Sequence, residues 1–441
     1  MQEKPQKKIP KGVIIQSILI GILFSGDQIF GFFEQNFFNT YLEHVLWLEP
    51  FEFLFLKIEP ISLMVSLSAA VGLVANLTWG IISDNTRSRF GRRKPYLLFG
   101  GIIAGVSMIA FAFTQDYLSA LVIDVLIIGI ASNAYYVTER SLIPDSVDVE
   151  YRGRANGIVN IIGYIGLLIA VAGFLIANEL FSVPNPVEDG TIITPEGHFF
   201  VLLIGGGAFI LCGIIGFLTI KEVSPSELPP RRLFFSELKQ IFNYSEFRKN
   251  NEFFKLTLAY TIFRCGIGVI MPFLFVFIFS LGLSTLELVG SIGIGFPILF
   301  IVIFILGRLA DRYGRKKYVP ASIIITSIGL VGVLFVKQGT EVNLLIFGLT
   351  LPFILVALLG LVTPLNAWAQ DLMPEEERGK FYGLLNIIFT ISQIIGAFAA
   401  GFVTTNEALG TAWIFPLGAV FFLISIPFFM MVKETVLQIE E

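Results

Sequence analysis

The sequence predicts an all-α membrane protein with twelve transmembrane helices in two pseudo-symmetric six-helix bundles. Two observations lead to this fold class. The mean hydropathy is +0.80 with only 15% charged residues, and two loop motifs recur at nearly the same offset along the chain. A soluble domain of 441 residues needs a larger charged fraction to cover its surface.

Twelve apolar runs are long enough to cross a bilayer, because ~20 apolar residues span ~30 Å of hydrocarbon. The first run follows four lysines and shows neither the short apolar core nor the cleavage site of a signal peptide, so we expect it to be retained. The runs cover residues 13–42, 60–82, 96–114, 118–142, 156–181, 198–220, 254–281, 288–307, 318–336, 343–368, 381–403 and 412–432.

The positive charges predict the orientation of these helices. Of the 30 lysines and arginines, 27 lie in the tails and in every second loop. The opposite side holds only Lys57 and Lys337, and Arg264 lies within a helix. The positive-inside rule therefore places both termini in the cytoplasm, which requires an even number of helices.

One long polar segment divides the chain into three parts. We expect an N-terminal six-helix bundle (1–220), a cytoplasmic linker (221–253) and a C-terminal six-helix bundle (254–441). The linker contains three prolines, and its residues 236–243 could form a short amphipathic helix on the membrane surface. A tether is the favoured interpretation of this linker, and a regulatory site is the alternative.

Two repeated motifs indicate that the bundles arose by duplication. The loop 80–94 and the loop 307–317 share a glycine, an aspartate and a basic cluster, and their aspartates, Asp84 and Asp311, are 227 residues apart. A second motif begins at Arg152 and again at Arg378, 226 residues later. Two independent motifs at nearly one offset predict a repeated six-helix unit, a known transporter architecture.

The second of these loops carries a family resemblance. Residues 307–316 match the pattern G-x-x-x-D-R-x-G-R-K, and the chain is therefore similar to the major facilitator superfamily. The first loop is four residues longer between Asp84 and Gly91, and it resembles the glycoside–pentoside–hexuronide symporters and the sucrose-transporter-like proteins. The resemblance implies a monomeric transporter that works by alternating access. Sodium-coupled glycoside symporters carry two aspartates in helix 2 where this chain has Gly72 and Asn76, so sodium coupling is not expected.

The loop charges form a candidate cytoplasmic gate. Asp84 and Asp311 can pair with nearby arginines and close one side of the protein while the halves move. By resemblance to the sucrose-transporter-like pattern Arg-x-Leu-x-x-Asp, Arg140 is the expected partner of Asp84. The alternative is that these charges only set the topology. The predicted gate residues are Asp84, Arg92, Arg93, Arg140, Arg152, Asp311, Arg315 and Arg378.

Charged residues inside helices form a candidate coupling site, because an intramembrane charge costs about 2.5–3.5 kcal/mol and needs a reason. Asp27 lies ~21 Å into helix 1, Glu34 is on roughly the same face, and Arg264 lies ~15 Å into helix 7. The segment 25–27 resembles the position of a sugar-site acid in the glycoside symporters. We expect Asp27 to carry the proton, with Glu34, Asp124 and Glu139 as other candidates, and to pair with Arg264. The alternatives are a Glu34 that faces water and an Arg264 that bonds to a local carbonyl.

Amide and aromatic side chains complete the predicted site and suit a sugar, whose hydroxyls accept and donate hydrogen bonds. Each of them could instead join helices. The predicted residues are Asp27, Glu34, Asp124, Asn133, Tyr136, Asn160, Arg264, Asn366, Trp368, Asn386 and Gln393.

The sequence therefore predicts a secondary active transporter in the plasma membrane, moving a sugar or glycoside with protons. The alternatives are an exporter or uniporter of another small organic solute and, remotely, an integral-membrane enzyme. We expect no cofactor and no metal, and the net charge of −4 indicates no nucleic-acid partner.

Overall fold

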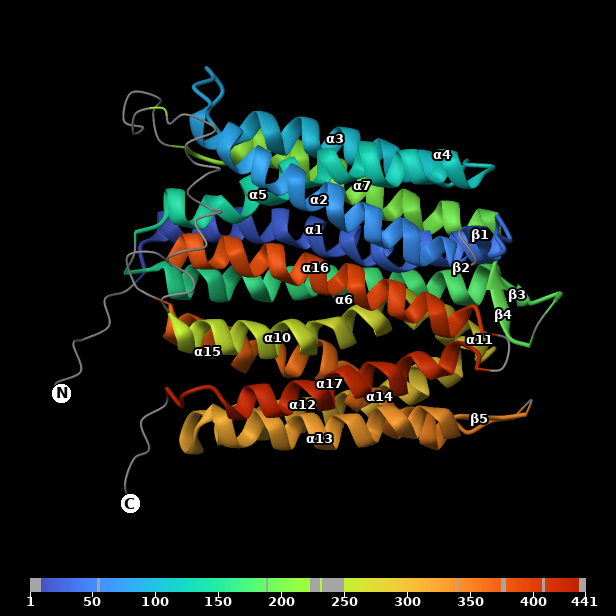
Figure 1. Cartoon of the computed structure of the whole chain (residues 1–441). Coiled ribbons are helices and arrows are strands. Elements are labelled where there is room, and N and C mark those ends of the chain that lie inside the picture. The colour runs from blue at the N-terminus through green and yellow to red at the C-terminus, as the bar shows by residue number, and fades with distance from the viewer. Residues whose placement is uncertain are drawn as a thin grey trace. The chain divides into compact units, whose positions relative to one another are not determined.

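The computed structural model is almost entirely helical (Figure 1). It describes residues 9–53, 56–148, 150–187, 189–222, 231, 250–339, 341–373, 378–406 and 409–435. Within these residues, 11 helices are long and apolar enough to cross a membrane. A further apolar helix, α14 (Leu344–Leu355), is shorter and is followed by η5 (Val356–Gly360) and α15 (Val362–Leu372), which together cover the predicted run 343–368.

The predicted helices of the first half are present. They are α1 (Lys11–His44), α2 (Pro60–Asn85), α3 (Lys94–Phe111), α4 (Tyr117–Leu121), η1 (Val122–Ile128), α5 (Gly129–Ser146), α6 (Arg152–Phe181) and α7 (Pro195–Thr219). The predicted run 118–142 is not one regular α-helix, because η1 is a π-helical turn in which the Gly129 N–H bonds to the Asp124 carbonyl. Such turns widen a helix locally and often occur at functional sites.

The second half repeats this irregularity. Its helices are α10 (Asn251–Ile270), η3 (Met271–Phe273), α11 (Leu274–Ser280), α12 (Thr285–Tyr313), α13 (Arg315–Gly332), η4 (Val333–Phe335), α14, η5, α15, α16 (Arg378–Thr404), η7 (Thr411–Trp413) and α17 (Ile414–Met430). The η5 turn is also π-helical, and it interrupts the fourth helix of this half as η1 interrupts that of the first. The break at η3 coincides with Pro272, which has no N–H to continue the helical bonds.

Three short antiparallel hairpins gather at one end of the helices, called here the hairpin end (Figure 1). They are β1 (Phe51–Phe53) with β2 (Leu56–Ile58), β3 (Ser182–Pro184) with β4 (Thr191–Ile193), and β5 (Lys337–Gln338) with β6 (Glu341–Val342). The signature loops lie at the other end, called here the loop end. The sequence did not predict these hairpins.

Contacts divide the chain into two compact units. Unit 1 comprises Met1–Tyr41, Val71–Phe181 and Thr194–Glu237, and unit 2 comprises Leu42–Ala70, Ser182–Ile193 and Leu238–Glu441. The segments 42–70 and 182–193 thus group with the helices of the second half, although they belong to the first half of the sequence. The predicted amphipathic helix at 236–243 lies outside the described residues.

Glycines allow close helix packing inside each unit. In unit 1, a Cβ on Gly101 would lie 2.9 Å from the Gly213 Cα, so α3 and α7 meet backbone to backbone. In unit 2, a Cβ on Gly268 would lie 3.0 Å from the Gln393 Cα, which brings α10 against α16. Small residues at such crossings are typical of membrane helix pairs. The second contact helps to position α10, which carries Tyr260 and Arg264.

Candidate functional site

Four acidic side chains gather inside unit 1. Asp27 and Glu34 come from α1, Asp124 from η1 and Glu139 from α5. Asp27, Asp124 and Glu139 are only 6%, 4% and 3% exposed. We call these four residues the acidic cluster. The π-helical turn of η1 lies at Asp124, so the irregular backbone coincides with one of the acids.

The cluster is organised around one face of α1. Asp27, Gly31 and Glu34 follow one another at i, i+4 and i+7, which places them on the same side of the helix. A Cβ on Gly31 would lie 3.9 Å from both the Asp27 Oδ1 and the Tyr136 hydroxyl. Tyr136 also donates a hydrogen bond to Glu34, and the charge of Asp124 faces Glu34 as well. Tyr136 therefore lies beside Gly31 and close to both carboxylates of α1.

Neighbouring contacts hold α1 in this position. The Tyr135 hydroxyl donates to the Leu23 carbonyl at 3.1 Å, which joins α5 to α1. The Cys212 thiol donates to the Ile22 carbonyl at 3.3 Å, which joins α7 to α1. The Phe209 ring packs against Tyr135 with 4.2 Å between centroids. Asp27 is thus presented by a stretch of α1 that two other helices support.

The electrostatics of the cluster are unbalanced. Arg140 is the cation that faces Asp27 and Glu139, and its guanidinium lies 5.6 Å from the centroid of the Tyr136 ring. The Asp27 Oδ2 and the Glu139 Oε2 are buried without a hydrogen-bond partner among the described residues. Carboxylates in close proximity resist simultaneous ionisation. The arrangement is therefore suited to taking up and releasing protons.

Unit 2 contributes a polar and aromatic group on α10, α15 and α16. The Arg264 guanidinium lies 4.7 Å from the centroid of the Phe389 ring, and no ion pair of Arg264 is seen among the described side chains. The Tyr260 hydroxyl donates to the Asn366 Oδ1 at 3.0 Å. Asn386 and Gln393 are exposed on α16. Asp27 and Arg264 belong to different units, so their pairing stays a prediction.

Three other predicted residues have local roles in the structure. Trp368 is fully buried, and its Nε1 donates to the Lys433 carbonyl at 3.1 Å, so its ring packs inside unit 2. Asn133 donates to the Gly129 carbonyl at 2.7 Å, next to the π-helical turn. Asn160 is exposed on α6.

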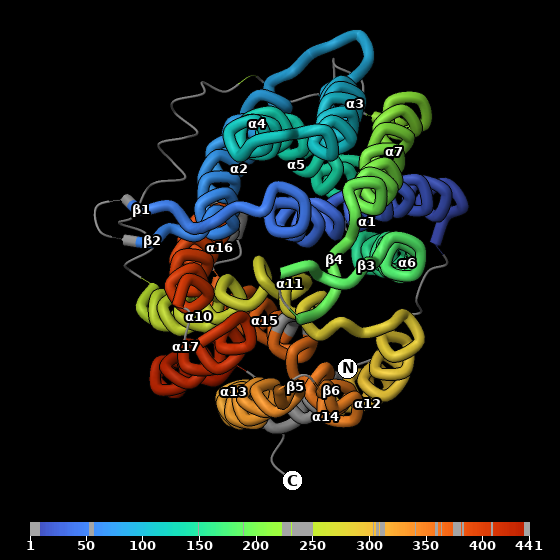
Figure 2. The backbone as a smooth tube through the Cα atoms, turned by 90° about the vertical axis from the view of Figure 1, so that its right-hand side faces the viewer, coloured from blue at the N-terminus to red at the C-terminus, as the bar shows by residue number. Residues whose placement is uncertain are grey.

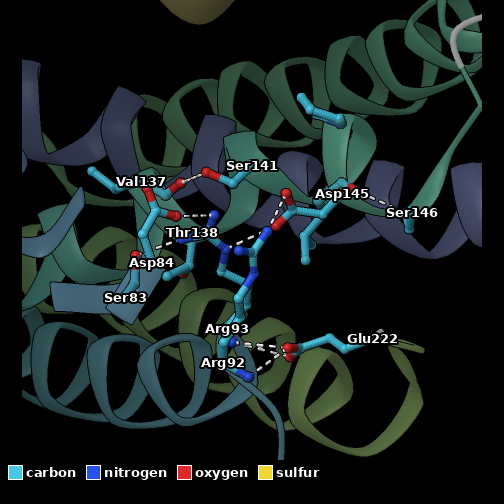
Figure 3. A network of polar contacts seen from close by, with 12 residues as sticks. Ser83, Asp84, Arg92, Arg93, Val137, Thr138, Ser141, Asp145, Ser146 and Glu222 are labelled. Atoms are coloured by element: carbon cyan, nitrogen blue, oxygen red, sulfur yellow. Dashed lines mark hydrogen bonds and ion pairs between the residues drawn. The ribbon is translucent and has the colours of Figure 1, made fainter. Parts of the chain in front are cut away.

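A network of ion pairs joins three helices at the loop end of unit 1 (Figure 3). Arg93 is 4% exposed, and it contacts Asp84 at 2.5 Å and Asp145 at 2.9 Å. Arg92 contacts Asp145 at 2.5 Å. The expectation that Arg140 pairs with Asp84 is wrong, because Arg93 at the start of α3 occupies that position and Arg140 lies in the acidic cluster instead.

Arg152 also lies at this end, but it bonds to backbone. Its guanidinium donates to the Val147 carbonyl at 2.9 Å and to the Pro144 carbonyl at 2.7 Å. These carbonyls lie at the C-terminal end of α5, where the last carbonyls of a helix have no intrahelical donor. Arg152 therefore fixes the end of α5 against the start of α6.

The sequence reasoning missed Glu222, which caps α3. Its carboxylate accepts backbone N–H bonds from Arg92 at 2.6 Å, Arg93 at 3.0 Å and Lys94 at 2.7 Å (Figure 3). Gly91 precedes these donors with φ +112°, and a Cβ there would lie 2.7 Å from the Glu222 carboxylate. A carboxylate at a helix N-terminus also interacts favourably with the helix dipole.

The second half repeats this cap. Glu434 accepts the Lys316 N–H at 2.8 Å, beside Gly314 with φ +94°. Arg315 contacts Asp371 at 2.5 Å. The sequence feature that could have predicted these two caps is a Lys-Glu pair after the last helix of each half, at 221–222 and 433–434. The side chains of the predicted gate residues Asp311 and Arg378 lie outside the described part of the structure.

A search against known families matches the Major Facilitator Superfamily at residues 22–397 and again at 295–438. The chain belongs to this superfamily. A mutant of the nucleoside transporter NupG has a similar fold, with a TM-score of 0.68, 13% identity and coverage of 95% of this chain and 99% of that chain. The D-xylose-proton symporter has a TM-score of 0.65, 17% identity and coverage of 96% and 98%.

A sequence relative of this superfamily member is the general alpha-glucoside permease of Schizosaccharomyces pombe (strain 972 / ATCC 24843). The two are 28% identical over 136 residues, which is 26% of this chain and 24% of the permease. The match thus spans about a quarter of the permease's length. Membership of the superfamily confirms the predicted transporter class, the multi-pass membrane location and the exclusion of an enzyme.

Proposed function

We propose that the chain is a proton-coupled symporter of a small polar solute, a sugar or glycoside, acting as a monomer in the plasma membrane with both termini in the cytoplasm. The observation that carries the proposal is the acidic cluster, in which Arg140 faces two of the four carboxyl groups, Asp27 and Glu139, while the carboxyl group of Glu34 faces Asp27 and Asp124. The buried, unpartnered oxygens of Asp27 and Glu139 are the natural acceptors of the transported proton.

Protonation of the cluster supplies the coupling. With Asp27 and Glu139 both ionised, the Arg140 guanidinium balances one of the two buried charges, and the remaining negative charge is unfavourable at low dielectric. A bound proton relieves this repulsion and favours the occluded state. Access to water on the side of low proton concentration then favours release.

The second half supplies groups suited to the solute. Arg264 and Asn366 present guanidinium and amide groups and Phe389 presents a ring face, while the buried Tyr260 hydroxyl orients the Asn366 amide. Hydrogen-bonding groups around an aromatic face match the hydroxyls and the apolar ring face of a sugar. The names of the alpha-glucoside permease and of the D-xylose-proton symporter support this solute class. Asp27 facing Arg264 is part of the proposal.

Uptake by proteoliposomes tests the proposal. The panel is maltose, D-xylose and uridine, each with and without an inward proton gradient. We expect gradient-driven accumulation of a sugar, and we expect Asp27→Asn to abolish accumulation while sparing exchange. Sugar flux that ignores the proton gradient would establish a uniporter. Uptake of uridine without uptake of either sugar would refute the sugar assignment.

A further inference from the structure

The β3–β4 hairpin carries features that a simple connection between helices does not need. It follows α6 and precedes α7, which both belong to unit 1, yet its residues 182–193 group with the helices of unit 2. Figure 2 views the molecule from the hairpin end and shows β4 beside α11, in agreement with the contacts between these two elements.

Two glycines form the contact between the hairpin and the end of α11. Gly190 has φ +117°, and a Cβ there would lie 2.7 Å from the Phe279 carbonyl oxygen and 2.9 Å from the Ser280 Cα. Gly282 has φ +64°, and a Cβ there would lie 3.1 Å from the Gly190 Cα. The two backbones therefore touch without side chains between them, and this contact has no room for a methyl group.

Polar contacts hold the hairpin in place around these glycines. The Ile193 N–H donates to the His44 Nδ1 at 3.2 Å, and the His44 ring meets the Phe279 ring edge to face at 5.2 Å. Lys337 donates to the Ser280 carbonyl at 3.1 Å and pairs with Asp189 at 3.7 Å. The ends of α1 and α11 and the start of β5 thus meet at the hairpin.

We propose that the β3–β4 hairpin is a gate at the hairpin end of the transport path and that the structure shows it closed on α11. The contacts suit repeated opening, because they are close but individually weak. The side chains of the Asp189–Lys337 pair are 61% and 28% exposed, and such a pair is weak enough to break repeatedly while it still favours the closed form. A ladder of three residue pairs joins the two strands of the hairpin. This inference rests on membership of a transporter superfamily and not on the identity of the solute.

The reactivity of an engineered cysteine tests the gate without any solute. The reporter is Ser280→Cys in a Cys212→Ala/Cys265→Ala background, because the Ser280 Cα lies 2.9 Å from the Cβ position of Gly190, at the contact that the hairpin closes. A membrane-impermeant thiol reagent is added on the side of the hairpins. Gly190→Ala obstructs closure, and we expect it to raise the labelling rate at least about fivefold.

Gly339→Ala is the matched control. Gly339 has φ +63° in the turn between β5 and β6 but nothing within 4 Å of its Cβ position, so it adds backbone strain without a clash at α11. A labelling rate for Gly190→Ala within twofold of the control would overturn the proposal. Because no solute is present, this failure would leave the proposed sugar transport untouched.

Hydrogen exchange provides a second measurement. In Gly190→Ala, peptides covering residues 182–193 should exchange faster while those of α3 and α7 remain unchanged, which also shows that the variant is folded. Unchanged exchange of the hairpin would equally overturn the gate. If Gly190→Ala does not fold, Lys337→Met provides a second variant that leaves the glycine contact intact. It should still raise both the labelling rate and the exchange rate of the hairpin. No rise in either rate would overturn the gate.

Discussion

Replacing Glu222 with glutamine is expected to destabilise unit 1 from its loop end. The Glu222 carboxylate accepts three backbone N–H bonds at the start of α3. The same helix start carries Arg93, which is buried between Asp84 and Asp145. Glutamine keeps the size of the side chain and one carbonyl acceptor, but it removes the negative charge that these donors face.

The magnitude follows from the number of donors. A hydrogen bond to a charged group contributes about 1.5–3 kcal/mol, against about 0.5–1.5 kcal/mol for a neutral one, so the charge adds roughly 1 kcal/mol per bond. Three bonds give roughly 3 kcal/mol at low dielectric, and partial exposure of the site reduces this to about 2 kcal/mol. Glu287→Gln is the matched control, because within the described residues Glu287 accepts a single backbone N–H, that of Ser284 before α12. We expect it to cost under about 1 kcal/mol.

Detergent titration of both variants in mixed micelles gives the difference in the free energy of unfolding. Glu222→Gln should lose at least about 1 kcal/mol more than Glu287→Gln. Initial uptake rates, measured in parallel, show whether the gate is disturbed as well. Equal losses for the two variants would refute the reasoning, because the number of capped donors would then have no influence on stability.

Three further changes give distinct results. Burial raises the pKa of Glu59, which precedes α2, to about 7. The protonated carboxyl group therefore contributes fully to stability below pH ~4.5, and this contribution is lost as the pH rises through about 7. Thermal unfolding at pH 5 and pH 8 should show a loss of about 3 kcal/mol at most, and Glu59→Gln should abolish this pH dependence. Arg93→Met leaves Asp84 and Asp145 without their shared cation and should cost about 3 kcal/mol in the same detergent titration; a neutral effect would contradict a structural role for the network. Tyr136→Phe removes the donor to Glu34 and should lower proton-driven uptake several-fold more than Tyr135→Phe, whose hydroxyl bonds only to backbone; equal uptake by the two variants would exclude a role for that hydroxyl.

The helices could be predicted from the sequence because long apolar runs bounded by charges allow few alternatives in a membrane. The predicted run 13–42 became Lys11–His44, and 381–403 became Arg378–Thr404. The π-helical turns could not be predicted, since the shift from i+4 to i+5 bonding at Asp124 leaves no periodic signal. The three-residue strands were equally invisible, because alternation needs more residues than these strands contain.

The sequence predicted which residues of the candidate site lie together in unit 1, but it predicted their partners only in part. Asp27, Glu34, Asp124 and Tyr136 do meet in unit 1. The sequence analysis placed Arg140 in the gate. The spacing of residues along α5 does not show which neighbouring helix a side chain faces, so the sequence could not show that Arg140 faces α1 rather than α2. Glu222 and Glu434 are 212 residues apart, so a search at the offset of the other repeats passes over them.

Because Arg140 lies in the acidic cluster, α5 carries residues of both the acidic cluster and the loop-end network. Tyr136, Glu139 and Arg140 lie in the acidic cluster, and Asp145 lies in the loop-end network. Glu139 and Asp145 are six residues apart, or ~9 Å along a helix. One short segment of α5 thus carries a carboxylate of the acidic cluster and the acceptor for both Arg92 and Arg93. Pro144 lies between these two groups within the helix, and the Arg152 guanidinium bonds to the carbonyls at the end of α5. Building on the proposed function, we infer that a proton bound in the acidic cluster alters the loop-end network through α5, and that Arg140 belongs to this link rather than to a pair with Asp84.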